Sequence, residues 1–110
     1  MALLVNGQTL ATTEQGFLVD LQTWNDSVAE ELARIDGITL SPAHWEILRF
    51  IRQYYLDYRH LPNARVFAKA IKHGLGEEKA SSRYLQMLFP QGPLKYACKL
   101  AGLPKPPTCL

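Results

Sequence analysis

Apolar and polar residues alternate over short distances at the start of the chain. Leu3 to Leu10 contains two short apolar runs on either side of Asn6-Gly7, and Asn-Gly favours the two-residue turn of a β-hairpin. Alternation around Phe17 and Val19 predicts a further short strand over Gly16 to Asp20. We therefore expect a hairpin or small β-meander, which must pack on helices because it is too small to be stable alone.

Five later segments carry apolar residues at helical spacing and have start and stop signals. We expect helices from Thr23 or Asn25 to Gly37, Ser41-Pro42 to about Tyr58, Asn63 to about Gly74, Ser81 or Ser82 to Phe89, and Pro93 to Gly102. Polar caps, or proline at the first helical position, mark the starts, and glycine marks several ends. The pattern predicts an α+β fold, with a small N-terminal β-meander or hairpin packed on an array of about five helices.

Each of the first four predicted helices has an apolar face for packing. In chain order the faces are Val28, Leu32 and Ile35; Trp45, Leu48, Ile51, Tyr55 and Tyr58; Val66, Phe67, Ala70 and Ile71; and Tyr84, Leu85 and Leu88. The aromatic residues of the second helix also suggest a cofactor or base-stacking surface, but their spacing favours packing. His44, in the first turn of that helix, is expected at the surface.

The chain of 110 residues is long enough for one domain with a single modest core. We expect residues 1–102 to form that domain and residues 103–110 to form a mobile, proline-rich C-terminal arm, because prolines do not continue a helix. The apolar runs are too short for a membrane span, and the N-terminus lacks the basic region of a signal peptide. We expect a cytoplasmic protein with no membrane contact.

Charge is distributed unevenly along the chain. Residues 1–46 carry seven acidic side chains against Arg34 alone, whereas residues 47–110 carry eleven Lys and Arg against three acidic side chains. One interpretation is that this charge only keeps the protein soluble. The other is that the C-terminal half contacts an acidic protein surface or nucleic acid, with Arg83, Lys95, Lys99 and Lys105 as candidate contacts.

The second and third predicted helices, joined by a short turn, resemble a helix-turn-helix pair. Arg65, Lys69 and Lys72 follow one side of the third helix, as they would in a recognition helix. Many helical domains contain such a pair, and basic side chains commonly face solvent. A DNA-binding regulator with a cysteine redox switch is therefore our alternative hypothesis.

The sequence carries no familiar enzyme or metal-binding motif. The glycines form no phosphate-binding loop, the three histidines are scattered, and no Cys/His spacing matches a zinc site. We expect neither a metal nor a cofactor. The candidate catalytic residues are the two cysteines, Cys98 and Cys109.

The two cysteines occupy different settings. Cys98 lies in the last predicted helix near Lys95 and Lys99, whose charges favour a thiolate, while the nearby helix C-terminus opposes it. Cys109 is the penultimate residue, and at roughly 3 Å per residue its thiol reaches about 20 Å from Gly102. The alternative interpretation gives neither cysteine a function. In it, Cys98 is a small buried apolar residue and Cys109 is a passive thiol in the tail.

Geometry also allows the arm to fold back towards the domain. A disulfide between Cys98 and Cys109 forms if their Cα atoms come within about 7 Å. A persulfide on Cys109 is then resolved by Cys98, which releases the outer sulfur and leaves the disulfide.

Several segments resemble the DsrC/TusE family. They are Asn6-Gly7, Glu14 to Phe17, Leu40 to Glu46, Gly76 to Lys79, Ser82 to Leu85, Leu88 to Pro93, Lys99 to Pro106 and the penultimate Cys109. The resemblance spans essentially the whole chain. It implies a small α+β fold and a sulfur carrier that acts with partner enzymes as a sulfurtransferase and holds a persulfide on Cys109.

The resemblance implies two alternative pathways. TusE-like proteins relay sulfur from a TusBCD-like complex towards a tRNA thiouridylase that makes 2-thiouridine. DsrC-like proteins act with DsrEFH-like donors and dissimilatory sulfite reductase, using both cysteines and inserting the arm into the reductase. TusE-like proteins often keep only the penultimate cysteine, so Cys98 favours the DsrC-like chemistry without excluding a tRNA relay.

Overall fold

The N-terminal segment is a two-stranded antiparallel hairpin. The structure is a computed structural model that describes residues 1–107. Strands β1 (Ala2–Val5) and β2 (Gln8–Ala11) pair with Leu3 opposite Leu10. Asn6 and Gly7 take φ values of 50° and 80°, as a turn with two left-handed residues requires. The predicted hairpin is confirmed.

The segment that follows the hairpin is not a full third strand. It contributes one isolated antiparallel bridge, between Thr12 and Leu18. A tight turn interrupts it, in which the Thr13 N–H donates to the Phe17 carbonyl at 2.8 Å. The meander is therefore smaller than predicted, because local turn bonds satisfy backbone groups that a longer strand would pair.

Five α-helices and two short 3₁₀ segments follow, and the α+β prediction is confirmed. Their bounds are η1 (Leu21–Thr23), α1 (Asp26–Ile35), α2 (Pro42–Tyr58), α3 (Ala64–Leu75), η2 (Glu78–Ala80), α4 (Ser82–Leu88) and α5 (Pro93–Leu100). Asn25, Ser41, Asn63 and Ser81 each accept a backbone N–H at the start of a helix. These caps satisfy N–H groups that the first helical turn leaves without partners.

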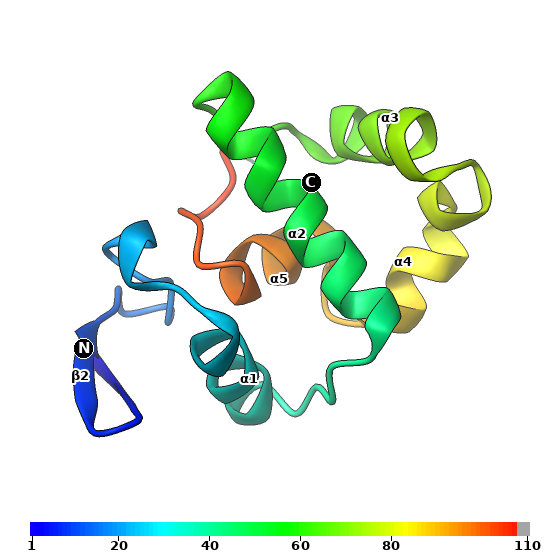
Figure 1. The fold of residues 1–110 in the computed structure, drawn as a ribbon. Coiled ribbons are helices and arrows are strands. Elements are labelled where there is room, and N and C mark those ends of the chain that lie inside the picture. Colours follow the sequence, from blue (N-terminus) through cyan, green and yellow to red (C-terminus); the bar gives the residue numbers. More distant parts are fainter. Residues whose placement is uncertain (108–110) are drawn as a thin grey trace.

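Helix α5 lies at the centre of the helical array. It contacts α1, α2 and α4, while α3 packs against η2 and the hairpin lies at the edge beside α1 (Figure 1). Its residues Leu94, Ala97, Cys98 and Leu100 are all buried in the hydrophobic core. The C-terminal helix is therefore an interior element.

Three residues assigned to apolar faces are exposed instead. Ile35 is 55% exposed, Tyr58 60% and Val66 40%. All three lie in the first or last turn of their helices. The spacing of apolar residues predicted which central helical turns are buried, but it did not predict how far towards the helix ends the burial continues.

His44 is buried, so the prediction that it lies at the surface is wrong. Its Nε2 lies 2.8 Å from the Leu88 carbonyl oxygen, and its Nδ1 lies 3.1 Å from the Ser41 backbone N and 2.7 Å from Ser41 Oγ. Because the carbonyl only accepts, Nε2 carries the proton and Nδ1 accepts from Ser41. The imidazole therefore joins the start of α2 to the end of α4.

Replacing His44 with alanine leaves the Leu88 carbonyl buried without this donor. We expect His44→Ala to lower the free energy of unfolding by about 1–3 kcal/mol in urea titrations. His60→Ala is the matched control, because His60 is exposed and contacts the carbonyl of Tyr58 nearby; we expect a change within about 0.5 kcal/mol. Equal losses in the two variants would contradict this account.

Candidate functional site

Helix α5 holds Cys98 inside the core. The thiol lies on the helix face that carries Leu94 and Ala97, and the residue has no exposed surface. Burial raises the pKa of Cys98 to about 12, because removal from water disfavours the charged thiolate. In this conformation Cys98 is a protonated thiol without access to solvent.

The lysines on either side of Cys98 do not offset this burial. Lys95 Nζ lies over the Tyr96 ring, 5.8 Å from its centroid. Lys99 Nζ donates to Asp36 Oδ1 at 2.9 Å and lies the same distance from Oδ2. The expectation that these lysines favour a Cys98 thiolate is therefore wrong, since desolvation prevails.

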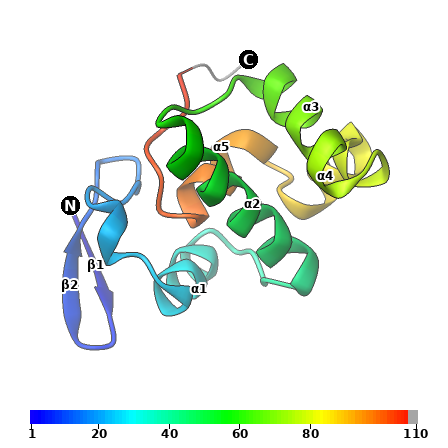
Figure 2. The ribbon, with the colours of Figure 1, turned by 45° about the horizontal axis from the view of Figure 1, so that its top comes forward.

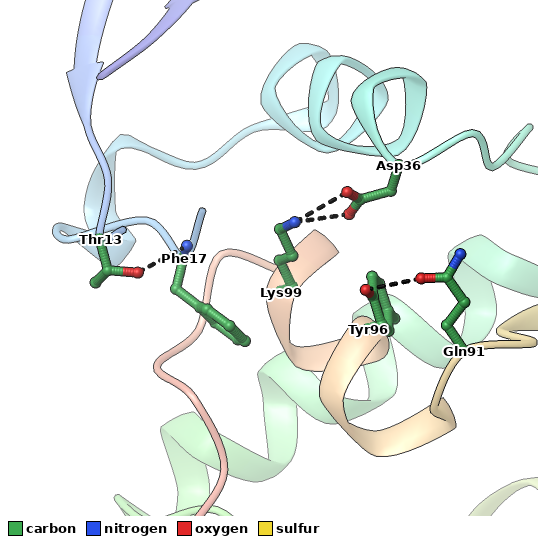
Figure 3. A network of polar contacts seen from close by, with 6 residues as sticks. All are labelled: Thr13, Phe17, Asp36, Gln91, Tyr96 and Lys99. Atoms are coloured by element: carbon green, nitrogen blue, oxygen red, sulfur yellow. Dashed lines mark hydrogen bonds and ion pairs between the residues drawn. The ribbon is translucent and has the colours of Figure 1, made fainter. Parts of the chain in front are cut away.

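Lys99 is part of the internal structure of the domain. Figure 3 shows its side chain reaching from α5 to Asp36, directly after α1, close to the turn between Thr13 and Phe17. A Cβ at Gly16 in that turn would lie 2.9 Å from Lys99 Cε, so the loop closes over the lysine stem. The ion pair joins α5 to the end of α1, and the loop packs against the lysine stem.

The segment predicted to be a separate arm begins inside the core. Leu103 has no exposed surface and Pro106 is buried, whereas Pro104, Lys105 and Pro107 are exposed. In two views the segment after α5 runs back along the C-terminal half of α2 (Figure 1, Figure 2). Cys109 lies outside the described residues.

The remaining candidate contacts are distributed over the surface. Arg83 and Lys105 are exposed and Lys95 is half-buried. The elements that carry Arg83 and Lys105, α4 and the segment after α5, lie at opposite ends of α5 (Figure 1). Lys105 borders a pocket of about 550 Å³, together with Glu14 and Val19. The structure therefore does not gather the predicted basic contacts into one cluster.

The basic residues of the helix-turn-helix hypothesis lie on α3. Arg65, Lys69 and Lys72 are all exposed there. Within residues 1–107, no three or more His, Cys, Asp and Glu side chains gather where they would hold a metal ion. No helix in this range has both the length and the apolar character needed to cross a bilayer.

Comparison with known proteins establishes the family. The family model described as "DsrC like protein" matches residues 4–110. The chain belongs to the DsrC-like family. Among curated relatives of this family member, Sulfurtransferase TusE of Sodalis glossinidius is 51% identical over 105 residues, covering 96% of this chain and 97% of that protein. Sulfurtransferase TusE of Escherichia coli K12 is 44% identical and covers 98% and 99%.

Solved structures of the DsrC-like family have the same fold. Allochromatium vinosum DsrC, determined by NMR, superposes with a TM-score of 0.91 at 45% identity, over the full length of both chains. The oxidized gamma-subunit of the dissimilatory sulfite reductase from Archaeoglobus fulgidus superposes with a TM-score of 0.83 at 39% identity, also over both full chains. The resemblance stated from the sequence motifs is confirmed.

Some residues around α5 carry no clear signal in the sequence. Asp36 follows the last turn of α1 and is an ordinary surface acid by pattern. Trp24 and Arg52, which bond to the end of α5, are separated from it by 76 and 49 residues. Only Gly102, just past the helix, indicated that this end is a structured cap.

The burial of Cys98 predicts unequal reactivity of the two thiols. At neutral pH a pKa of about 12 lowers the thiolate fraction of Cys98 about a thousandfold relative to the ordinary value of 9.0. Brief treatment with iodoacetamide should add one adduct in native protein and two in denaturing guanidinium, as counted by intact mass. Cys109→Ser should add none natively, and rapid native alkylation of that variant would contradict the buried site.

The same pKa shift predicts a contribution to stability in alkali. The pKa of Cys98 is higher in the folded state than in the unfolded state. The contribution of the buried neutral thiol to the free energy of unfolding is therefore fully present below about pH 9 and is lost as pH rises towards 12. Wild-type stability should therefore fall by up to about 1.4 kcal/mol per pH unit more than that of Cys98→Ala in this range. Parallel pH profiles in urea titrations would contradict the assignment.

Proposed function

We propose that this protein is a sulfur carrier that holds sulfur as a persulfide on Cys109 and passes it to a partner enzyme. Family membership over residues 4–110 carries the proposal, supported by curated relatives named sulfurtransferase. The burial and raised pKa of Cys98 leave the penultimate cysteine as the better nucleophile.

The chemistry needs one thiol on the carrier. A donor persulfide gives its outer sulfur to the Cys109 thiolate, and the donor leaves as a thiolate. An acceptor thiolate then attacks the outer sulfur of the Cys109 persulfide, and Cys109 leaves as a thiolate. Each step exchanges one S–S bond for another, so the relay requires no external oxidant.

Cys98 takes no part in this minimal cycle. Its attack on Cys109 as a resolving thiol requires the sulfur to leave the core and lose a proton that burial retains. We therefore propose a TusE-like relay from a TusBCD-like donor towards a tRNA thiouridylase, since TusE-like proteins often keep only the penultimate cysteine. The alternative is a DsrC-like pathway, with a DsrEFH-like donor and dissimilatory sulfite reductase as the acceptor. If both cysteines operate in that pathway, the end of α5 must open to expose Cys98.

Docking by basic side chains completes the proposal. Arg83, Lys95 and Lys105 are accessible to an acidic donor or to an enzyme with bound tRNA. Lys99 is left out, because its side chain is 11% exposed and paired with Asp36. Arg83 and Lys105 lie on elements at opposite ends of α5, which suits successive partners better than one compact footprint.

Persulfide loading tests this function directly. After incubation with a cysteine desulfurase and cysteine, intact mass should show a gain of one sulfur atom on the wild type and on Cys98→Ala. Cys109→Ser should gain none. Adding the loaded carrier to a purified tRNA thiouridylase with ATP and tRNA should yield 2-thiouridine, measured by nucleoside mass spectrometry.

Two outcomes would overturn the proposal. One is no sulfur on the wild type, and the other is equal loading of Cys109→Ser. A Cys98→Ala carrier that loads but fails to deliver would restore the two-thiol mechanism. Slower loading of Lys95→Gln and Lys105→Gln would support docking by these side chains.

The DNA-binding alternative stays a prediction, tested by gel shifts with genomic fragments at physiological salt.

A further inference from the structure

The end of α5 fixes where the following segment leaves the domain. The N–H of Leu103 donates to the Cys98 carbonyl at 3.0 Å, and the N–H of Gly102 donates to the Lys99 carbonyl at 3.1 Å. These are the paired bonds of a Schellman cap, which needs a left-handed residue; Gly102 provides it with φ of 73°. The carbonyls of the next two residues, Leu100 and Ala101, must find partners elsewhere.

Trp24 and Arg52 provide those partners from distant parts of the chain. Trp24 Nε1 donates to the Leu100 carbonyl at 2.8 Å, and Arg52 Nη1 donates to the Ala101 carbonyl at 2.7 Å. The guanidinium lies 4.2 Å from the centroid of a Trp24 ring, so the two donors also support each other. We refer to Trp24 and Arg52 as the α5 bracket.

The bracket fits closely against the exit of the arm. A Cβ at Gly102 would lie 2.5 Å from Trp24 Cδ1 and 2.8 Å from Trp24 Cβ, so the indole leaves room for glycine only. The positive charge of Arg52 faces the negative end of the α5 dipole. Burial lowers the pKa of its guanidinium, which nevertheless remains protonated near neutral pH.

We propose that Trp24 and Arg52 are positioning residues that set the direction of the chain after Gly102 and thereby present Cys109 to its partners. The inference rests on the proposed function, because it assigns them a role in sulfur transfer. Leu103 and Pro106, both buried, continue the anchored path beyond the bracket. Cys109 follows Pro107 by only two residues in the sequence, so the path of the chain up to Pro107 limits where the thiol can lie.

Proline makes this transmission efficient. Pro104, Pro106 and Pro107 each fix φ near −65°, which leaves the segment few internal rotations to absorb a change at its base. A change of direction at Gly102 is therefore passed along the described segment as far as Pro107. A displacement of a reacting atom by about 1 Å from its productive position lowers the reaction rate by up to about a hundredfold.

The chain provides a matched control for the bracket. Arg49 lies on the same helix as Arg52 and stacks 5.2 Å from the ring of Trp45. Its side chain is 59% exposed and pairs with Asp26, and neither Arg49 nor Trp45 donates to a carbonyl at the end of α5 in the described residues. Loss of this second Arg–Trp pair thus removes a similar interaction without touching the arm.

The first test measures the direction of the arm itself. Nitroxide labels are attached to Cys109 and to a cysteine introduced by Met87→Cys, since Met87 is 67% exposed on α4 and Cys98 is buried. We expect Trp24→Phe and Arg52→Gln to broaden or shift the distance distribution in pulsed electron paramagnetic resonance. Trp45→Phe and Arg49→Gln should keep the distribution of the parent protein.

The second test links direction to chemistry. With persulfide-loaded carrier and a purified acceptor, we expect Trp24→Phe and Arg52→Gln to lower kcat/KM for sulfur transfer about tenfold or more. The rate of Cys109 alkylation by iodoacetamide should stay within about twofold of wild type, because the free thiol is chemically unchanged. Arg52→Lys should not restore transfer, because an ammonium group is not planar. It cannot stack on the Trp24 ring and donate to the Ala101 carbonyl at the same time, as the guanidinium does.

The outcomes separate the bracket from the proposed function and from folding. The proposed role of the bracket would be overturned if folded Trp24→Phe and Arg52→Gln kept the distances and transfer rates of the wild type. It would also be overturned if the Trp45 and Arg49 variants lost as much transfer rate as the bracket variants. If Arg52→Gln fails to fold by circular dichroism, Trp24→Phe decides, because it keeps an aromatic ring and removes the N–H donor. If the wild type takes up no sulfur, the proposed function fails, while the distances still decide whether the bracket directs the arm.

Discussion

The structure depends on the burial of one face of α5. Leu94, Ala97, Cys98 and Leu100 are all buried, and Ala101 and Leu103 continue the buried surface past the end of the helix. Helices α1, α2 and α4 contact this last helix of the chain, so the other elements enclose it. A C-terminal segment commonly frays because few contacts hold it. Here it starts from the core and stays partly anchored, because Pro106 is buried while Pro104, Lys105 and Pro107 are exposed.

That burial has a consequence for cysteine chemistry. The contacts that anchor α5 also remove Cys98 from water and keep its thiol protonated. Reactive thiols occupy partly exposed, electropositive surroundings, and the position of Cys98 is the reverse of this. The burial of Cys98 therefore makes it a poor nucleophile, and the proposed relay uses Cys109 instead. A two-thiol cycle needs a partner that opens the last turn of α5, whereas a one-thiol relay needs no such event.

Local features of the fold were predictable from sequence, and long-range polar contacts were not. The Asn6-Gly7 turn, the Ser41-Pro42 helix start and the glycine after α5 act within a few residues, so spacing and capping rules identify them. His44 meets Leu88, and Trp24 meets Leu100, across 44 and 76 residues. Nothing at the sequence positions themselves indicates such partners. The thiolate prediction for Cys98 failed similarly, because it weighed neighbouring lysines without knowing the depth of burial.

The uneven charge along the chain has an internal explanation as well as an external one. Three ion pairs in residues 1–107 join the acidic first part to the basic second part: Arg49 with Asp26, Lys79 with Glu46, and Lys99 with Asp36. Arg52 is also engaged inside the domain, at the end of α5. The excess of basic residues after residue 46 therefore overstates the positive surface offered to partners. Lys105 remains exposed on the described part of the segment that leads to Cys109, so the charge that does reach the surface there is close in sequence to the residue proposed to carry sulfur.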